Sequence, residues 1–159
     1  MEKILFICVH NSARSQIAEA YLKQLGGEEF QVESAGFEPT TINPLVVEVM
    51  REEGIDLSEK STQSAFELFK KGRTFTYVIT VCDESVDKKC PIFPGMTHRL
   101  HLPFADPAKV EGTEEEKLSQ FRSVRDQIKG VMQEFIDWVR TGNKKKPGNF
   151  WETKDIKSK

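Results

Sequence analysis

The hydrophobic positions of this chain form two kinds of pattern that alternate along the sequence. Short runs of apolar and β-branched residues predict four buried strands, at Lys3–Val9, Phe30–Ala35, Thr74–Val81 and His98–Leu102. Apolar residues at helical spacing predict four helices, at about Arg14–Leu25, Asn43–Met50, Ser64–Lys71 and from Thr113 to near Gly142. Strands that alternate with helices predict an α/β fold, a single-domain four-stranded parallel sheet flanked by helices on both faces.

Residues that favour helix ends support these boundaries. Gly26 and Gly27 are expected to end the first helix, and Asn43 suits the N-cap position of the second. Thr113 and Glu116 have the spacing of a capping box, in which each side chain bonds to the backbone of the other residue. The long last helix is therefore expected to begin directly after Thr113.

Three polar or reactive residues follow three of the predicted strands. Cys8 follows the first strand, Cys82 the third and Asp106 the fourth. In open parallel sheets, active sites lie beyond the carboxyl ends of the strands. The sequence therefore predicts that a nucleophile, a second thiol and an acid meet at one edge of the sheet.

The stretch from Cys8 to Ser15 has the order strand, loop and helix that suits anion binding. Successive backbone N–H groups of such a loop can converge on a tetrahedral anion, and the fork of Arg14 can bind two of its oxygens. The same positive field stabilises a thiolate at Cys8. The alternative is a buried strand-end cysteine beside a capping arginine, but the spacing and context favour a nucleophile loop. The predicted substrate-binding residues are Val9, His10, Asn11, Ser12, Ala13, Arg14 and Ser15.

A polar segment separates the second and third cysteines, Cys82 and Cys90. If it were helical throughout, their Cα atoms would lie about 12 Å apart, and a disulfide needs about 7 Å or less. Pairing of these two thiols would therefore require the segment to unwind or loop. They could instead be a core residue and an incidental surface thiol. The position of Cys82 beside the anion loop favours a thiol–disulfide relay.

Asp106 precedes Pro107 after the last predicted strand. A carboxyl group on a rigid turn can protonate a leaving oxygen, although Asp-Pro pairs are also common in ordinary turns. The place of Asp106 at the end of a strand favours the general acid.

Composition narrows the possible functions. The chain has 159 residues, enough for one domain, and its net charge of −2 gives no reason to expect nucleic acid or membrane binding. No apolar run approaches the roughly 20 residues of a membrane helix, and the N-terminal run is too short for a signal peptide, so we expect a cytoplasmic protein. Three cysteines do not suit a secreted disulfide framework, and no Cys/His spacing is typical of zinc. We expect neither a metal nor a bound cofactor.

The chain is expected to divide into a folded domain, residues 1–142, and a basic tail, residues 143–159. The tail is rich in lysine and contains Phe150 and Trp151. It could bind a partner, but a solvated tail with an aromatic anchor on the domain is the preferred interpretation.

With these residues in place, the chain resembles arsenate reductases of the low-molecular-weight protein tyrosine phosphatase fold. The resemblance extends over nearly the whole chain, roughly from Lys3 to Arg140. The features that carry it are the loop Cys8–Ser15, Cys82, Cys90 and the pair Asp106-Pro107. The loop is shared with the phosphatases, whereas the paired downstream cysteines are typical of the reductases.

The resemblance implies a role for each of these residues. Cys8 would be the nucleophile, Arg14 would hold the oxyanion and Asp106 would be the general acid. Cys82 and Cys90 would be the relay thiols of the thioredoxin-coupled subgroup. The substrate would be arsenate, with phosphate or sulfate as competing oxyanions, and the reductant thioredoxin, or glutaredoxin with glutathione. Proteins of this kind are often monomers.

The chain departs from the family pattern at several positions. His10 and Ala13 stand where the family commonly has glycine and cysteine, and the gap from Cys82 to Cys90 is one residue longer than usual. None of these changes alters the nucleophile or the arginine.

A further departure concerns a potassium site that some members have near the loop. Asn11, Glu19 and Ser34 match part of that site, but Gln63 stands where an aspartate is expected. We therefore predict no required metal.

Two other functions compete with arsenate reduction. The first is a low-molecular-weight phosphatase acting on phosphotyrosine or another phosphate monoester. Such phosphatases usually have aromatic residues after the Asp-Pro pair, and here Ala108-Lys109 follow. The second is an oxyanion sensor without catalysis, which would need neither Cys82 nor Asp106.

Overall fold

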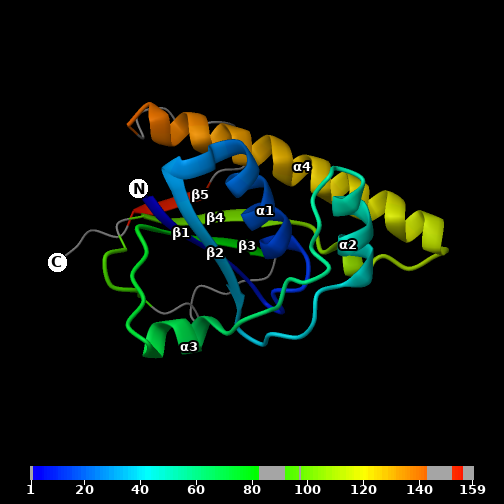
Figure 1. Ribbon diagram of the computed structural model, residues 1–159, viewed down its shortest axis with the longest axis horizontal. Helices are drawn as coiled ribbons and strands as arrows, with labels where there is room; N and C mark the ends of the chain where they lie inside the picture. The colour runs from blue at the N-terminus through cyan, green and yellow to red at the C-terminus, as the bar shows by residue number, and fades with distance from the viewer. Residues whose placement is uncertain (1, 83–91, 97, 143–151, 156–159) are drawn as a thin grey trace.

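One mixed β-sheet forms the centre of the molecule. The computed structural model describes residues 2–82, 92–96, 98–142 and 152–155. The strands of the sheet are β1 (Glu2–Cys8), β2 (Phe30–Gly36), β3 (Tyr77–Cys82), β4 (His98–Phe104) and β5 (Glu152–Asp155). Their order is β2-β1-β3-β4-β5, and the first four are parallel, which confirms the predicted α/β fold (Figure 1).

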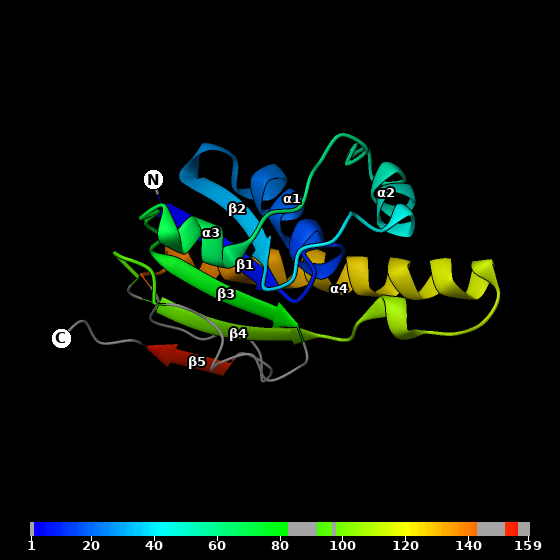
Figure 2. The same cartoon turned by 90° about the horizontal axis from the view of Figure 1, so that it is seen from below.

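The fifth strand was not predicted from the sequence. β5 pairs antiparallel with β4, with Glu152 opposite His101 and Asp155 opposite His98, and Figure 2 shows it running against the other strands. It lies in the segment for which the composition predicts a solvated tail. Backbone pairing with an exposed sheet edge needs little from the side chains, so a polar segment gives no sign of it.

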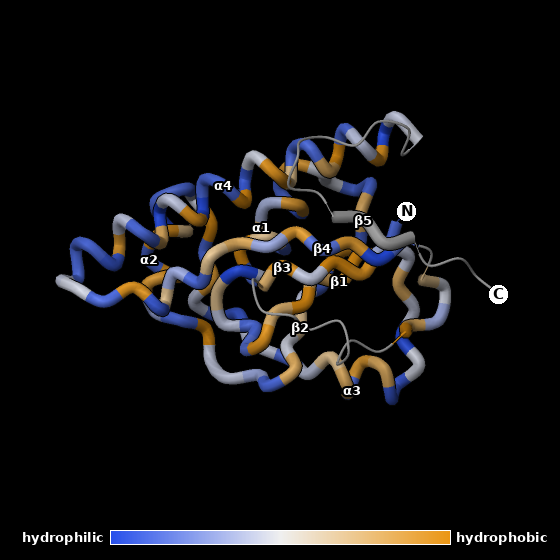
Figure 3. Tube along the Cα trace, turned by 180° about the vertical axis from the view of Figure 1, so that it is seen from behind, coloured by the Kyte–Doolittle hydropathy of each residue, from blue (hydrophilic) through white to orange (hydrophobic). Residues whose placement is uncertain are grey.

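The helices form two layers around the sheet. They are α1 (Arg14–Gly26), α2 (Pro44–Arg51), α3 (Ala65–Lys70) and α4 (Glu114–Arg140). Helices α1 and α4 pack together on one face, and α3 lies on the opposite face (Figures 1 and 3). Among the described residues, none of the helices combines the length and the apolar character that a membrane span requires.

The helix ends follow the residues that predict them. The Asn43 side chain accepts a hydrogen bond from the Leu45 N–H, and Thr113 and Glu116 form both bonds of a capping box. The predicted strand and helix positions hold to within a few residues. β4 continues two residues beyond the predicted end, to Phe104, and this extension brings Phe104 opposite Cys82, the last residue of β3.

The core lies on both faces of the sheet, because residues of α1, α4 and α3 all belong to the buried cluster. The residues of β1 from Ile4 to Ile7 are completely buried, as expected for a strand covered on both faces. The central strands are strongly hydrophobic in Figure 3. This rigid centre fixes where the strands end, and therefore where the residues that follow them lie.

Candidate active site

Two strand ends and a turn bring the predicted residues to one edge of the sheet. Cys8 is the last residue of β1 and Cys82 the last of β3, and these strands are neighbours. Cys82 pairs with Phe104, the last residue of β4, and Asp106 follows two residues later. A register shift between Thr80 and Cys82 accompanies this end of the sheet, and such irregularities are common next to active sites.

The backbone carbonyl groups of the loop after Cys8 point outward, toward the segment that follows β2. The carbonyls of Cys8, Val9, His10 and Ser12 accept hydrogen bonds of 2.8–3.3 Å from backbone N–H groups of residues 37–43. In a planar trans peptide, the N–H points away from the carbonyl of the preceding residue. The N–H groups that follow these carbonyls therefore face the inside of the loop, where they suit an anion.

Gly36 allows the loop to lie directly against the end of β2. A Cβ atom at Gly36 would come within 2.7 Å of the Val9 carbonyl oxygen and 2.9 Å of the Asn11 nitrogen. The neighbouring atoms are backbone, so they cannot move aside without shifting the loop. Gly36 was not identified as a site residue, although a glycine at a strand end is a known signal of close backbone approach.

Asn11 holds the loop from within. It is completely buried and has a positive φ of 56°, a conformation that asparagine tolerates better than most residues. Its Nδ2 donates to the Ser15 and Ser34 hydroxyls at 2.8 and 2.9 Å. Its Oδ1 accepts from the Gln63 N–H at 3.0 Å and from Gln16 Nε2 at 3.1 Å. Asn11 therefore braces the loop through four hydrogen bonds.

Arg14 and Asp106 meet at the other side of the loop. The Arg14 side chain is buried, and its Nη1 donates to the Phe104 carbonyl oxygen at 3.0 Å. Its Nη2 lies 3.6 Å from Asp106 Oδ2. The other carboxyl oxygen of Asp106 accepts from the Ala108 N–H at 2.9 Å and caps a short 3-10 helix, Pro107–Lys109. Asp106 is thus both the turn residue and a carboxylate directed at the arginine.

The two thiols in the described part of the chain are buried. Cys8 is 4% exposed and Cys82 is completely buried. Neighbouring strands lie about 4.8 Å apart, so the two cysteines end adjacent strands at close range. Cys90, predicted as the third thiol of a relay, lies outside the described residues.

The remaining loop residues differ in exposure: His10 is exposed, Val9 and Ser12 are half-buried, and Ala13 is buried. His10 Nδ1 lies 3.0 Å from the Glu38 carbonyl oxygen, and because a carbonyl can only accept, this nitrogen carries the proton. His10 is exposed, as expected for a residue at the rim. Ala13 precedes α1, and its carbonyl accepts from the Ile17 N–H at 3.0 Å.

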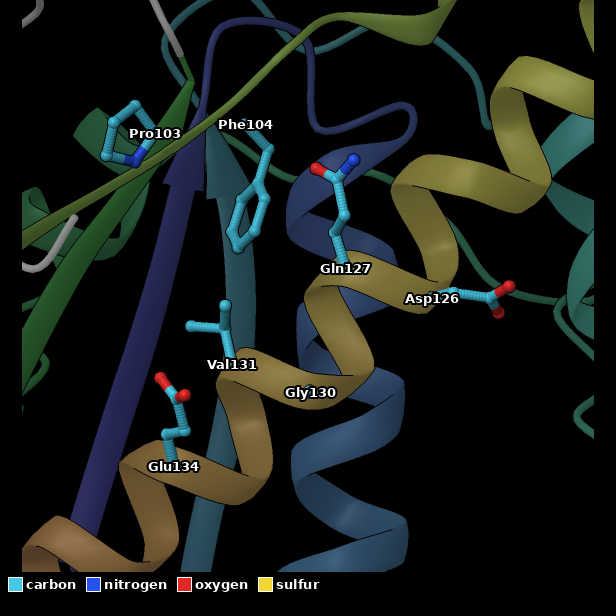
Figure 4. A pocket seen from close by; sticks show the side chains of 7 residues that line it. All are labelled: Pro103, Phe104, Asp126, Gln127, Gly130, Val131 and Glu134. Atoms are coloured by element: carbon cyan, nitrogen blue, oxygen red, sulfur yellow. The ribbon is translucent and has the colours of Figure 1, made fainter. Parts of the chain in front are cut away.

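A cavity of about 500 Å³ lies near this edge but has a different character. It is formed between β4 and α4 and is lined by Pro103, Phe104, Asp126, Gln127, Gly130, Val131 and Glu134. Figure 4 shows Phe104 and Glu134 directed toward the space between these elements, whereas Asp126 points away. Its lining is apolar and acidic, which does not suit an oxyanion. The anion loop remains the candidate site.

The described residues contain no group of three or more His, Cys, Asp or Glu side chains that could hold a metal. The polar residues around Asn11 instead bond to one another and to the loop. Glu19, which matches part of a potassium site by resemblance, is paired with Lys23 and Lys60. Gln63 also braces the chain beside the loop, because its side chain donates to the Ser34 carbonyl at 2.9 Å.

Comparison with known proteins gives a consistent result. Residues 3–146 match the low molecular weight phosphotyrosine protein phosphatase family. The arsenate reductase of Halalkalibacterium halodurans is 45% identical over 126 residues, which are 79% of this chain and 88% of that protein.

Two solved structures are similar over most of this chain. The thioredoxin-dependent arsenate reductase of Corynebacterium glutamicum has a TM-score of 0.66 and 30% identity, and the match covers 89% of this chain and 63% of that one. An arsenate reductase in a phosphate-binding state has a TM-score of 0.65 and 28% identity, with 86% and 98% covered. The chain therefore belongs to the low molecular weight phosphotyrosine protein phosphatase family.

Proposed function

We propose that this protein reduces arsenate to arsenite. The observation that carries the proposal is the loop Cys8–Ser15, whose outward carbonyls turn its amides inward beside a buried arginine and a strand-end cysteine. The similarity to arsenate reductases supports arsenate as the oxyanion. Cys82 at the end of the neighbouring strand supports a redox reaction, since hydrolysis would not need a second thiol.

The first step is attack on arsenate by the Cys8 thiolate. The loop amides and Arg14 bind the oxyanion and stabilise the charge that develops on its oxygens. A sulfur–arsenic bond forms, an arsenic–oxygen bond breaks, and Asp106 protonates the departing oxygen. Arsenic is still in its oxidised state in the resulting adduct.

The second step transfers two electrons to arsenic. Cys82 attacks the Cys8 sulfur, the sulfur–arsenic bond breaks and its electron pair stays on arsenic, which leaves as arsenite. The product is a Cys8–Cys82 disulfide. Cys90 then attacks Cys82, which releases the Cys8 thiolate and forms a Cys82–Cys90 disulfide.

The cycle closes when an external dithiol reduces the Cys82–Cys90 disulfide. We propose thioredoxin as this reductant, because the solved relative from Corynebacterium glutamicum is thioredoxin-dependent. Glutaredoxin with glutathione is the alternative. We further propose that the protein acts as a monomer in a reducing compartment such as the cytoplasm. Its catalytic domain would span residues 1–142.

Single-turnover reaction with arsenate, followed by mass-spectrometric disulfide mapping, tests the relay. The wild-type protein is expected to release arsenite and to form a Cys82–Cys90 disulfide. Cys90→Ser is expected to release arsenite once and to stop with a Cys8–Cys82 disulfide. The proposal would be wrong if neither protein released arsenite and neither formed a disulfide.

Phosphate monoester hydrolysis is the second candidate, because the anion loop is shared with the phosphatases of the family. A phosphorylated Cys8 would be hydrolysed rather than reduced. Ala108-Lys109 follow the Asp106-Pro107 pair, so this position supplies no aromatic wall for a phenyl ring. Rapid turnover of phosphotyrosine in the absence of any reductant would favour this second function.

A further inference from the structure

A buried carboxylate lies directly behind the anion loop. Glu19 is on α1, and its side chain is only 2% exposed. Its Oε1 accepts a hydrogen bond of 2.6 Å from the Ser34 hydroxyl. Ser34 accepts in turn from Asn11 Nδ2 at 2.9 Å, so two hydrogen bonds connect Glu19 to a residue of the loop.

This position is unfavourable for the chemistry of the loop. An oxyanion and a thiolate are both negative, and a further negative charge nearby disfavours each of them. An uncompensated charge roughly 10 Å away, at an effective dielectric constant of about 20, moves an ionisation by about one pH unit. A carboxylate in this place therefore needs a compensating cation if the loop is to bind anions well.

Two lysines supply positive charge at the other oxygen of Glu19. Lys60 Nζ lies 2.7 Å and Lys23 Nζ 2.5 Å from Glu19 Oε2. The Lys60 side chain is 35% exposed and that of Lys23 51% exposed, so solvent screens the Lys60 pair less. Lys23 is on the same helix as Glu19, whereas Lys60 comes from the segment between α2 and α3.

The segment that carries Lys60 is also bonded to the loop support. The Ser61 carbonyl accepts from Gln16 Nε2 at 3.3 Å, and the Gln63 N–H donates to Asn11 Oδ1 at 3.0 Å. The segment that carries Lys60 is therefore held in place relative to Asn11.

We propose that Lys60 is a positioning residue of the active site, whose ammonium group compensates the Glu19 charge so that the loop can hold an oxyanion and a Cys8 thiolate. The inference rests on the role of Cys8 and the loop in the proposed function. It adds to that function a residue which touches neither the substrate nor the nucleophile.

The test measures phosphate binding by the loop and the ionisation of Cys8, rather than arsenate reduction. In the full chain, Lys60→Met is expected to weaken inorganic phosphate binding about tenfold, measured by calorimetry. The pH midpoint of Cys8 alkylation by iodoacetamide, followed by mass spectrometry, is expected to rise by about one unit. Lys60→Arg should keep both values, and Lys70→Met, which removes a distant exposed charge, should also leave both unchanged.

A second variant separates charge compensation from a structural role. Glu19→Gln keeps an oxygen that can accept from Ser34 but removes the negative charge. Combined with Lys60→Met, it is expected to restore both phosphate affinity and the alkylation midpoint to within about twofold and 0.3 units of wild type. If the defect persists in the double variant, or if Lys60→Met alone changes neither value, the proposal is overturned.

Neither measurement involves Cys82, Cys90 or a reductant. A failure of arsenate reduction would therefore leave the result for Lys60 intact. If wild-type protein does not bind phosphate in the loop, the inference about Lys60 is overturned at that first measurement, whereas arsenite release still decides the proposed function.

Discussion

The two halves of the active-site edge are built in different ways. On the β1–β2 side, the loop is held by the completely buried Asn11 and lies in close backbone contact with Gly36. On the β3–β4 side, the proposed general acid, Asp106, is on a turn. Asp106 is 17% exposed at its side chain, caps the following 3-10 helix and meets Arg14 at 3.6 Å, beyond hydrogen-bond distance.

This difference matches the two tasks that the proposed function assigns to the two sides. Binding an oxyanion requires donors that are already in place, because reorganisation would cost part of the interaction energy. A general acid must regain its proton from solvent in each cycle, and partial exposure permits this. We therefore expect changes on the β1–β2 side to alter oxyanion binding, and changes on the β3–β4 side to alter turnover while binding is kept.

Cys82→Ala is expected to separate oxyanion binding from turnover most clearly. Alanine fits a buried site, and the loop Cys8–Ser15 is untouched, so phosphate affinity should stay within about twofold of wild type. Arsenite release should fall below detection, because no second thiol can attack the Cys8 sulfur. Parallel calorimetry with phosphate and a single-turnover arsenite assay measure the two effects. Arsenite release at the wild-type rate would show that Cys82 is a structural thiol.

Asp106→Asn should give the next largest effect. Loss of a general acid lowers the rate of the step that expels oxygen by about 10² to 10⁴-fold. Phosphate binding should remain or become tighter, since a negative charge beside Arg14 is removed. Stopped-flow measurement of adduct formation and calorimetry test the two parts. If binding and rate fall together, Asp106 belongs functionally to the loop side, and the proposed division fails.

Gly36→Ala tests the loop side. The new Cβ would meet the Val9 carbonyl and the Asn11 nitrogen at 2.7 and 2.9 Å, so the loop has to shift. A displacement of about 1 Å costs about 10²-fold in activity, and phosphate affinity should fall as well. Gly130→Ala in α4 is the matched control, because its Cβ meets no atom within 4 Å. This control should keep activity and gain up to about 1 kcal/mol in unfolding free energy.

The sequence could predict the residues that follow the strands, but not the contacts that hold the loop in place. The loop, the thiols and the acid follow strands, and strand ends are readable from apolar runs, so Cys8, Cys82 and Asp106 could be placed at one edge. The contacts that hold the loop come from residues far apart in the chain, as with Gln63 and Asn11. No local pattern marks such a contact. The strand β5 was not predicted for a related reason: it pairs with β4 through backbone groups, which every sequence has.

The smallest expected effect concerns how the loop side is attached to the body of the protein. The Asn43 N–H donates to the Ser12 carbonyl at 3.0 Å and Asn43 caps α2, so α2 anchors the loop. Glu52 follows α2 and accepts from Arg122 and Arg125 of α4 at 2.9 and 2.8 Å. The hydrogen bonds from Arg122 contribute most to lowering the pKa of Glu52 below its ordinary 4.5.

The sign of the resulting pH dependence follows from that lowered pKa. The Glu52 contribution is fully present above about pH 4.5 and is lost as the pH falls through the lower folded-state value. Glu52→Gln should therefore be less stable than wild type at pH 7, by up to about 1 kcal/mol, and the gap should narrow as the pH falls below 4.5. Urea unfolding at pH 7 and at lower pH measures this. A gap that stays constant with pH would mean that Glu52 attaches α2 by packing alone, and the loop side would then owe its order to Asn11 and its buried partners rather than to the surface charges.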